Sequence, residues 1–199
     1  MEDFIFTAAK SVWVDVQEEN LKIEVELMKV KEVNENGRVK LIVTFDGTWT
    51  RHGFSSLFGS GTYFGVHSKL PLFTATHCQV FCVCKATEKK GAEMRTHMCM
   101  KTWSTSAGSM EPDIALEGVK EIAELYNVRV GTIVGDGDSK LDFHLQSELP
   151  EHLKNIDRFL DLNHIVKNFT SSLYDIHLAF QKTKAFPEKA IAVVLFLFD

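Results

Sequence analysis

The sequence has no hydrophobic run long enough to cross a membrane. Its most apolar stretch covers only residues 190–198, whereas a membrane-spanning helix needs about 20 residues. The chain begins with acidic rather than basic residues, and the apolar run at 4–9 is too short for the core of a secretory signal peptide. We therefore expect neither a signal for secretion nor a membrane anchor.

Cysteine is scarce, with four residues in a chain of 199. Without a secretory signal, we expect free thiols or metal ligands rather than disulfides. The sequence also lacks internal repeats and low-complexity segments. Hydrophobic residues make up 45% and charged residues 25%, which is ordinary for a globular protein. The chain is long enough for one domain with a sizeable core, or for one domain and a small appendage.

The sequence also has no excess of basic residues. Twenty-two Lys and Arg residues face 27 Asp and Glu residues, which gives a formal net charge of -5. This balance argues against a protein that coats nucleic acid through its bulk charge, although it leaves a local basic patch open.

The pattern of apolar residues predicts alternating helices and strands. We expect a helix over about 17–33, a turn at 34–37, strands at 39–45, 57–66 and 72–84, a charged loop at 85–96 and a short strand at 97–103. A helix that starts near 111–113 leads directly into a strand at 128–134, and two more helices follow at 152–162 and 164–180. A strand, a helix and another strand in succession are typical of an α/β protein.

Two of the predicted strands end in aspartate and glycine. The strand at 128–134 leads into Asp136 and Asp138, and the strand at 39–45 leads into Asp46. If these strands are neighbours, their carboxylates meet at one edge of the sheet, where they suit Mg²⁺, a cation that prefers oxygen ligands. The alternative is that Asp-Gly after a strand forms a simple turn.

Four further residues have a spacing that suits zinc. Cys82 and Cys84, like His97 and Cys99, are separated by one residue, and residues i and i+2 of a strand share a face. A hairpin from 82 to 99 would therefore put four Zn²⁺ ligands on one side. The usual zinc signature has two residues between cysteines, so the alternative is a set of reduced core cysteines and a surface histidine.

A short loop after Asp46 combines an aromatic residue with cationic ones. Trp49, Arg51 and His52 are suited to stacking on bases and contacting phosphates. The alternative is that Trp49 anchors the loop on the core. His164, early in a predicted amphipathic helix, is by itself more typical of a packing or capping residue than of a ligand.

Four motifs in order resemble the Mutator-like transposase domain. The family has Asp-Gly-Thr/Ser-Trp followed by basic-leaning positions, Gly and Ser-Ser, which is similar to residues 46–56. Cysteines come next, before a Gly-Ser-Met-Glu-like segment such as residues 108–111, and then Gly-Asp-Gly-Asp-Ser-Lys, which is intact at 135–140. The last motif is Cys-x-x-His before a Lys-Asn or Lys-Arg pair, similar to His164 and residues 167–168.

This resemblance, over roughly residues 40–180, implies a ribonuclease-H-like α/β fold, a mixed sheet flanked by helices. It implies Asp46 on the first strand and Asp136 or Asp138 after the fourth, as Mg²⁺ ligands for cutting and joining DNA at transposon ends. It also implies a nuclear location, and DNA contacts that include Lys140.

The sequence departs from the family pattern in ways that bear on activity. His52 stands in place of an arginine and Asp161 in place of the cysteine, and no residue is assigned as the third carboxylate of a C-terminal helix. We therefore expect an N-terminal helical segment at 1–37 and a transposase domain at 38–199 that is truncated before that carboxylate and inactive by itself. The alternative is a domesticated, non-catalytic DNA- or protein-binding module.

Overall fold

The computed structural model describes residues 2–28, 31, 33, 37–50, 56–80, 89–91, 101–125, 127–137 and 139–183. The chain forms two compact units, Met1–Phe159 and Leu160–Asp199. The first contains the sheet and most helices, and the second contains helix α5 (Leu162–Thr183). Within the described residues, no helix combines the length and the apolar character needed to cross a membrane.

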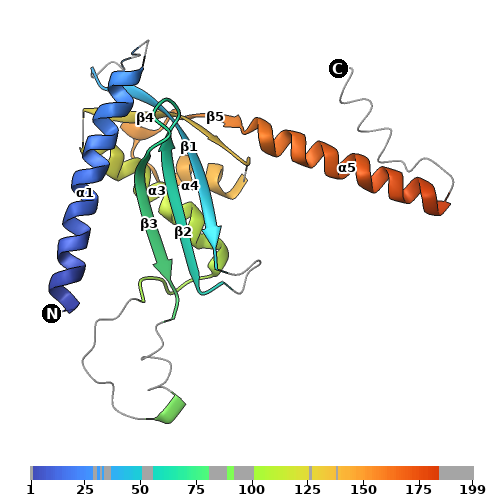
Figure 1. Cartoon of the computed structure of the whole chain (residues 1–199), viewed down its shortest axis with the longest axis horizontal. Coiled ribbons are helices and arrows are strands. Elements are labelled where there is room, and N and C mark those ends of the chain that lie inside the picture. Colours follow the sequence, from blue (N-terminus) through green and yellow to red (C-terminus); the bar gives the residue numbers. More distant parts are fainter. Residues whose placement is uncertain are drawn as a thin grey trace. The chain divides into compact units, whose positions relative to one another are not determined.

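Five strands form one mixed sheet in the order β3-β2-β1-β4-β5 (Figure 1). They are β1 (Val39–Trp49), β2 (Phe58–Gly65), β3 (Pro71–Cys78), β4 (Val128–Gly135) and β5 (Asp157–Leu160). β2 is antiparallel to both β1 and β3, whereas β1 and β4 are parallel. The connection between the parallel pair includes helix α3 (Met110–Leu125). The predicted α/β class is confirmed, and this arrangement is consistent with a ribonuclease-H-like fold.

The core lies between the sheet and helix α3, which contacts β2, β3 and β4 and packs beside α4 (Ser139–Glu148). One face of α3 is buried because its apolar residues recur at helical spacing, as Ile114, Val119 and Ile122 show. These side chains meet the buried residues Leu41 and Val43 of β1 in a single cluster. This packing fixes the start of α3 against the sheet.

Glycines allow α3 to approach the sheet closely. A side chain on Gly61 of β2 would meet Ile114, with Cβ only 2.7 Å from its Cγ2 atom. A side chain on Gly118 of α3 would meet the rings of Tyr63 and Phe73, with Cβ 2.6 Å from the nearest Tyr63 atom. The glycines of β2 therefore leave the space that α3 needs to pack closely on the sheet.

Helix α1 (Glu2–Leu27) lies against β3 and the turn between β2 and β3 (Figure 1). The buried carboxylate of Glu24 accepts hydrogen bonds from the backbone N–H groups of His67, at 3.0 Å, and Ser68, at 2.7 Å. One turn earlier, Asn20 Nδ2 donates to the carbonyl of Pro71 at 2.8 Å. Polar side chains of α1 thus satisfy backbone groups of the hairpin.

Two expectations about helices need correction. The helix expected at 17–33 instead begins at Glu2 and ends at Leu27. The helix expected at 152–162 is wrong, because a 3₁₀ turn (Glu151–Leu153) and strand β5 occupy that region. Asn155 adopts φ 67°, which an α-helix does not allow and which separates the turn from the strand.

The remaining expectations about strands have mixed outcomes. β2 and β4 match the predicted strands at 57–66 and 128–134 within a residue or two. β3 is confirmed up to Cys78, and residues 81–84 lie outside the described part. The described residues 101–103 of the strand expected at 97–103 are not in a strand, because Thr102 and Trp103 donate their backbone N–H groups to a single carbonyl, that of Cys78.

Candidate metal-binding site

The parallel pairing of β1 with β4 places two Asp-Gly motifs of the sequence, at residues 46–47 and 136–137, at one edge of the sheet. The last paired residues are Thr44 and Val134. Asp46 and Asp136 each lie two positions further along. Asp46 shares the face of Thr44 because residues i and i+2 of a strand point the same way, and Asp136 follows directly after the end of β4, on the neighbouring strand about 4.8 Å away.

Asp46 lies inside a strand rather than at its end, which corrects the expectation that the strand stops at residue 45. β1 continues to Trp49, and Asp46 pairs with Thr62 of β2. Its backbone is therefore fixed by the sheet while its side chain is exposed. Asp136 follows the last residue of β4 and is also exposed, next to Gly137, whose φ of 82° lets the chain bend away.

The structure places a further carboxylate, that of Glu111, near the same end of β1. The sequence analysis did not assign Glu111 to the site. A Cβ atom on Gly47 would lie 2.5 Å from Glu111 Cδ, so the carboxyl group of Glu111 lies against Gly47 on the α3 side of β1, whereas the side chain of the adjacent Asp46 points to the other face of the strand. Glu111 belongs to the first turn of α3, where the helix dipole favours a negative charge. Its place in the Gly-Ser-Met-Glu motif was the signal that could have identified it.

The ring of Trp49, at the end of β1, packs over the neighbouring strand β2. A Cβ on Gly59 would lie 2.8 Å from the Trp49 ring and 3.1 Å from Met110 Sδ, so both side chains cover this glycine. Trp49 is half-buried. The ring therefore packs on the fold, and it also remains partly accessible.

Other predicted site residues fall into two groups. Lys140 is exposed in the first turn of α4, and His164 is exposed near the start of α5. The predicted residues that lie outside the described part are Arg51, His52, Cys82, Cys84, His97, Cys99 and Asp138. Asp161, which replaces the cysteine of the last motif, caps α5: its Oδ1 accepts the backbone N–H of Asn163 at 3.0 Å.

The donor set suits the ion that was expected. Asp46, Asp136 and Glu111 present carboxylate oxygens, the ligands that Mg²⁺ prefers. Two of these side chains are exposed, so an ion would reach them from solvent and would retain water ligands. The chemistry of these donors suits a divalent ion bound by oxygen, but among the described residues their ligand atoms do not form a three-residue cluster within 4.8 Å of one another.

The fold and this edge together define a ribonuclease-H-like α/β protein with carboxylates beside its central parallel strands. The Mutator-like transposase family matches residues 5–193, and the chain belongs to this family. This membership assigns the chain a transposase-related function. A comparison with curated proteins found no match, and a comparison with solved structures found none.

Proposed function

We propose that this chain is the DNA-processing domain of a Mutator-like, cut-and-paste element, and that Asp46 and Asp136 hold its divalent metal ions. The observation that supports the proposal is the parallel pairing of β1 with β4, which ends at Thr44 and Val134, two positions before Asp46 and Asp136. Asp138, two residues beyond Asp136, is the substitute for Asp136 as a ligand. Family membership supports the substrate, which is DNA at transposon ends.

Each part of the site has a distinct role in this proposal. Divalent ions at such a site supply an activated water and stabilise the leaving oxygen of a phosphodiester. Asp46 would hold its ion in a fixed position because its backbone is part of β1 and pairs with Thr62 of β2. Glu111 adds negative charge near this end of β1 from the α3 side, where its carboxyl group lies against Gly47.

DNA contacts in this proposal come from residues around the same edge. Trp49, Arg51 and His52 follow Asp46 directly and combine an aromatic ring with cationic groups. Lys140 follows Asp136 and Asp138 and extends the DNA-contacting set on the other side. We place this activity in the nucleus, where the DNA substrate is.

Strand transfer needs a further element in this proposal. In the family pattern the third carboxylate comes from a C-terminal helix, and Glu111 comes from α3 instead. We therefore propose that this chain binds the metal but does not cut DNA by itself. The alternative function is a domesticated module that binds DNA or protein without catalysis.

Titration of the purified chain with Mg²⁺ and Mn²⁺, followed by calorimetry, tests the metal site. We expect saturable binding that is lost in Asp46→Asn and in Asp136→Asn. Asp157→Asn is the matched control, because Asp157 is an exposed acid on β5. Absence of binding in a chain whose circular dichroism shows a folded state would contradict the metal site.

A nicking assay on a terminal-repeat duplex separates the two functions. Cleavage that is lost in Asp46→Asn would show that the chain is active alone and would overturn the proposed inactivity. DNA binding that persists in EDTA and survives Asp46→Asn would favour the non-catalytic module. DNA binding that requires Mg²⁺, without cleavage, is the result that our proposal predicts.

A further inference from the structure

A second cluster of potential ligands lies at the same end of the sheet but on a different strand. His77 of β3 faces Asp113 and Glu117 of α3, which are one helical turn apart. One ligand atom from each of the three side chains lies within 4.8 Å of the others. All three residues are half-buried.

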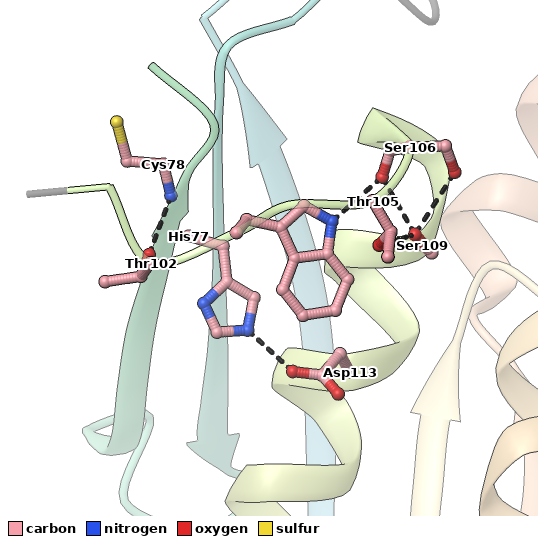
Figure 2. Close-up of polar contacts among 8 residues, drawn as sticks. His77, Cys78, Thr102, Thr105, Ser106, Ser109 and Asp113 are labelled. Carbon is pink, nitrogen blue, oxygen red and sulfur yellow. Dashed lines mark hydrogen bonds and ion pairs between the residues drawn. The ribbon is translucent and has the colours of Figure 1, made fainter. Parts of the chain in front are cut away.

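The histidine ring is held in one orientation by its neighbours. His77 Nε2 lies 2.8 Å from Asp113 Oδ2, and Figure 2 shows the ring of His77 directed from its strand toward the Asp113 carboxylate. On the ring face, the indole of Trp103 stacks at 4.6 Å between centroids and 9° between planes. Trp103 is itself fixed, because its Nε1–H donates to the carbonyl of Ser106 at 3.0 Å.

We propose that His77, Asp113 and Glu117 form a site for a divalent transition-metal ion of the Zn²⁺ type. An imidazole nitrogen with two carboxylate oxygens suits Zn²⁺ and its first-row neighbours, whereas Mg²⁺ prefers oxygen alone. The stacked indole of Trp103 fixes the plane of the His77 ring. The Asp113 side chain is 40% exposed, against 12% for His77, so water reaches the carboxylate side and can complete the coordination.

This site is separate from the carboxylates of Asp46 and Asp136. His77 pairs with Gly59 of β2, and Gly59 pairs in turn with Trp49 of β1. One whole strand therefore separates the two sites, which corresponds to about 10 Å across the sheet. The two sites differ in donor chemistry, so each has its own preferred ion.

The ion would act as a clamp between three parts of the fold. It joins the edge strand β3 to helix α3, and through the stacked Trp103 it supports the segment that leads into that helix. The hydrogen bond of His77 with Asp113 already joins β3 to α3 at this point.

Cobalt titration of the full chain tests this site. After metal is removed with a chelator, Co²⁺ is added and its visible absorption is recorded, and Zn²⁺ is then used to displace it. We expect one equivalent to bind through nitrogen and oxygen, and affinity to fall more than about tenfold in His77→Gln and in Glu117→Gln. The ion should also raise the thermal unfolding temperature of the wild-type chain and leave that of His77→Gln unchanged.

Two control backgrounds exclude the other candidate sites. Asp46→Asn removes the carboxylate site, and Cys82→Ser with Cys84→Ser removes half of the predicted cysteine site. Binding that survives in both backgrounds supports the His77 site, even where the magnesium titration fails. Unchanged affinity in both His77→Gln and Glu117→Gln, or a sulfur-to-cobalt charge-transfer band with all binding lost in the cysteine variant, would overturn it. If His77→Gln does not fold, Glu117→Gln and Asp113→Asn decide the question.

Discussion

The carboxyl group of Glu111 lies directly against the backbone of Gly47, so a substitution at one of these two positions affects the other. In Gly47→Ala the new Cβ would lie 2.5 Å from Glu111 Cδ, and the end of this flexible side chain must move. We expect the free energy of unfolding to change by no more than about 1 kcal/mol, because only a side-chain terminus is displaced. Mg²⁺ affinity should fall because the charged end of Glu111 is displaced, and calorimetry measures this affinity.

Glu111→Gln is the matched comparison for that substitution. It keeps the shape of the side chain and removes its charge, so Mg²⁺ affinity should fall while the fold is retained. If Gly47→Ala and Glu111→Gln both bind Mg²⁺ as the wild-type chain does, Glu111 has no part in the metal site.

Gly118→Ala should destabilise the protein, in contrast to the usual effect of alanine in a helix. The new Cβ would lie 2.6 Å from Tyr63 and 2.7 Å from Phe73, both of which are buried rings. Overpacking of this kind costs about 1–3 kcal/mol, which outweighs the gain of up to about 1 kcal/mol in helix propensity. Denaturant unfolding measures the difference, and Glu121→Ala, at an exposed position of the same helix, is the control. A more stable Gly118→Ala variant would show that the helix is not held as close to the sheet as described.

Glu24→Ala should be destabilising because it leaves two backbone donors without their acceptor. The carboxylate of Glu24 is fully buried and accepts the N–H groups of His67 and Ser68. Loss of a buried hydrogen-bond partner costs about 1–3 kcal/mol. Thermal or denaturant unfolding should show this cost, while Glu26→Ala, on the exposed side of α1, should be nearly neutral. Equal effects of the two substitutions would argue against the contact with the hairpin.

Tyr63 should make the stability of the folded state depend on pH in the alkaline range. Burial raises the pKa of the Tyr63 hydroxyl well above its ordinary value, and the positive charge of Arg158 opposes this with a smaller effect. The folded state therefore holds the phenol proton more tightly than the unfolded state does. Its contribution to stability is complete below a pH of about 10 and is lost as the pH rises further.

Absorbance at alkaline pH measures this effect. We expect Tyr63 to ionise only together with unfolding, whereas Tyr63→Phe should remove that component and flatten the alkaline loss of stability. The substitution also removes the hydrogen bond from the hydroxyl to the carbonyl of Ala115, at 3.0 Å, which is worth about 1 kcal/mol. Ionisation of Tyr63 in the folded state would contradict its burial.

The central parallel strands could be predicted because their sequences carry a strong signal. β4 is rich in β-branched residues, and a helix with clear periodicity precedes it. The family motifs then point to Asp46 and Asp136 as partners. Their placement follows from strand pairing, which depends on the order of the strands more than on any single residue.

The extension of β1 beyond Asp46 could not be predicted locally. Asp-Gly-Thr normally indicates a turn, and here the strand continues because β2 lies alongside and pairs with it up to Trp49. Tertiary pairing therefore overrides the local preference. The strand β5 was missed for a related reason, since the apolar spacing of its surroundings also fits a helix.

Contacts between distant segments left no trace in the sequence. His77 and Asp113 are 36 positions apart, and no spacing rule connects a strand residue to a helix in that way. Glu111 likewise reaches Gly47 only because α3 crosses the sheet at its glycines. Such contacts become visible when the packing of the helix is known.

The chain leaves β3 and returns to the fold at nearly the same point. The backbone N–H groups of Thr102 and Trp103 both donate to the carbonyl of Cys78, at 2.9 and 3.0 Å, and Gln79 Nε2 donates to the carbonyl of Thr105. A segment whose two ends are joined in this way adds little to the cost of closing the chain when its length changes. Residues 80–101 can therefore be lengthened, shortened or replaced as one insertion, while the sheet and the start of α3 keep their geometry.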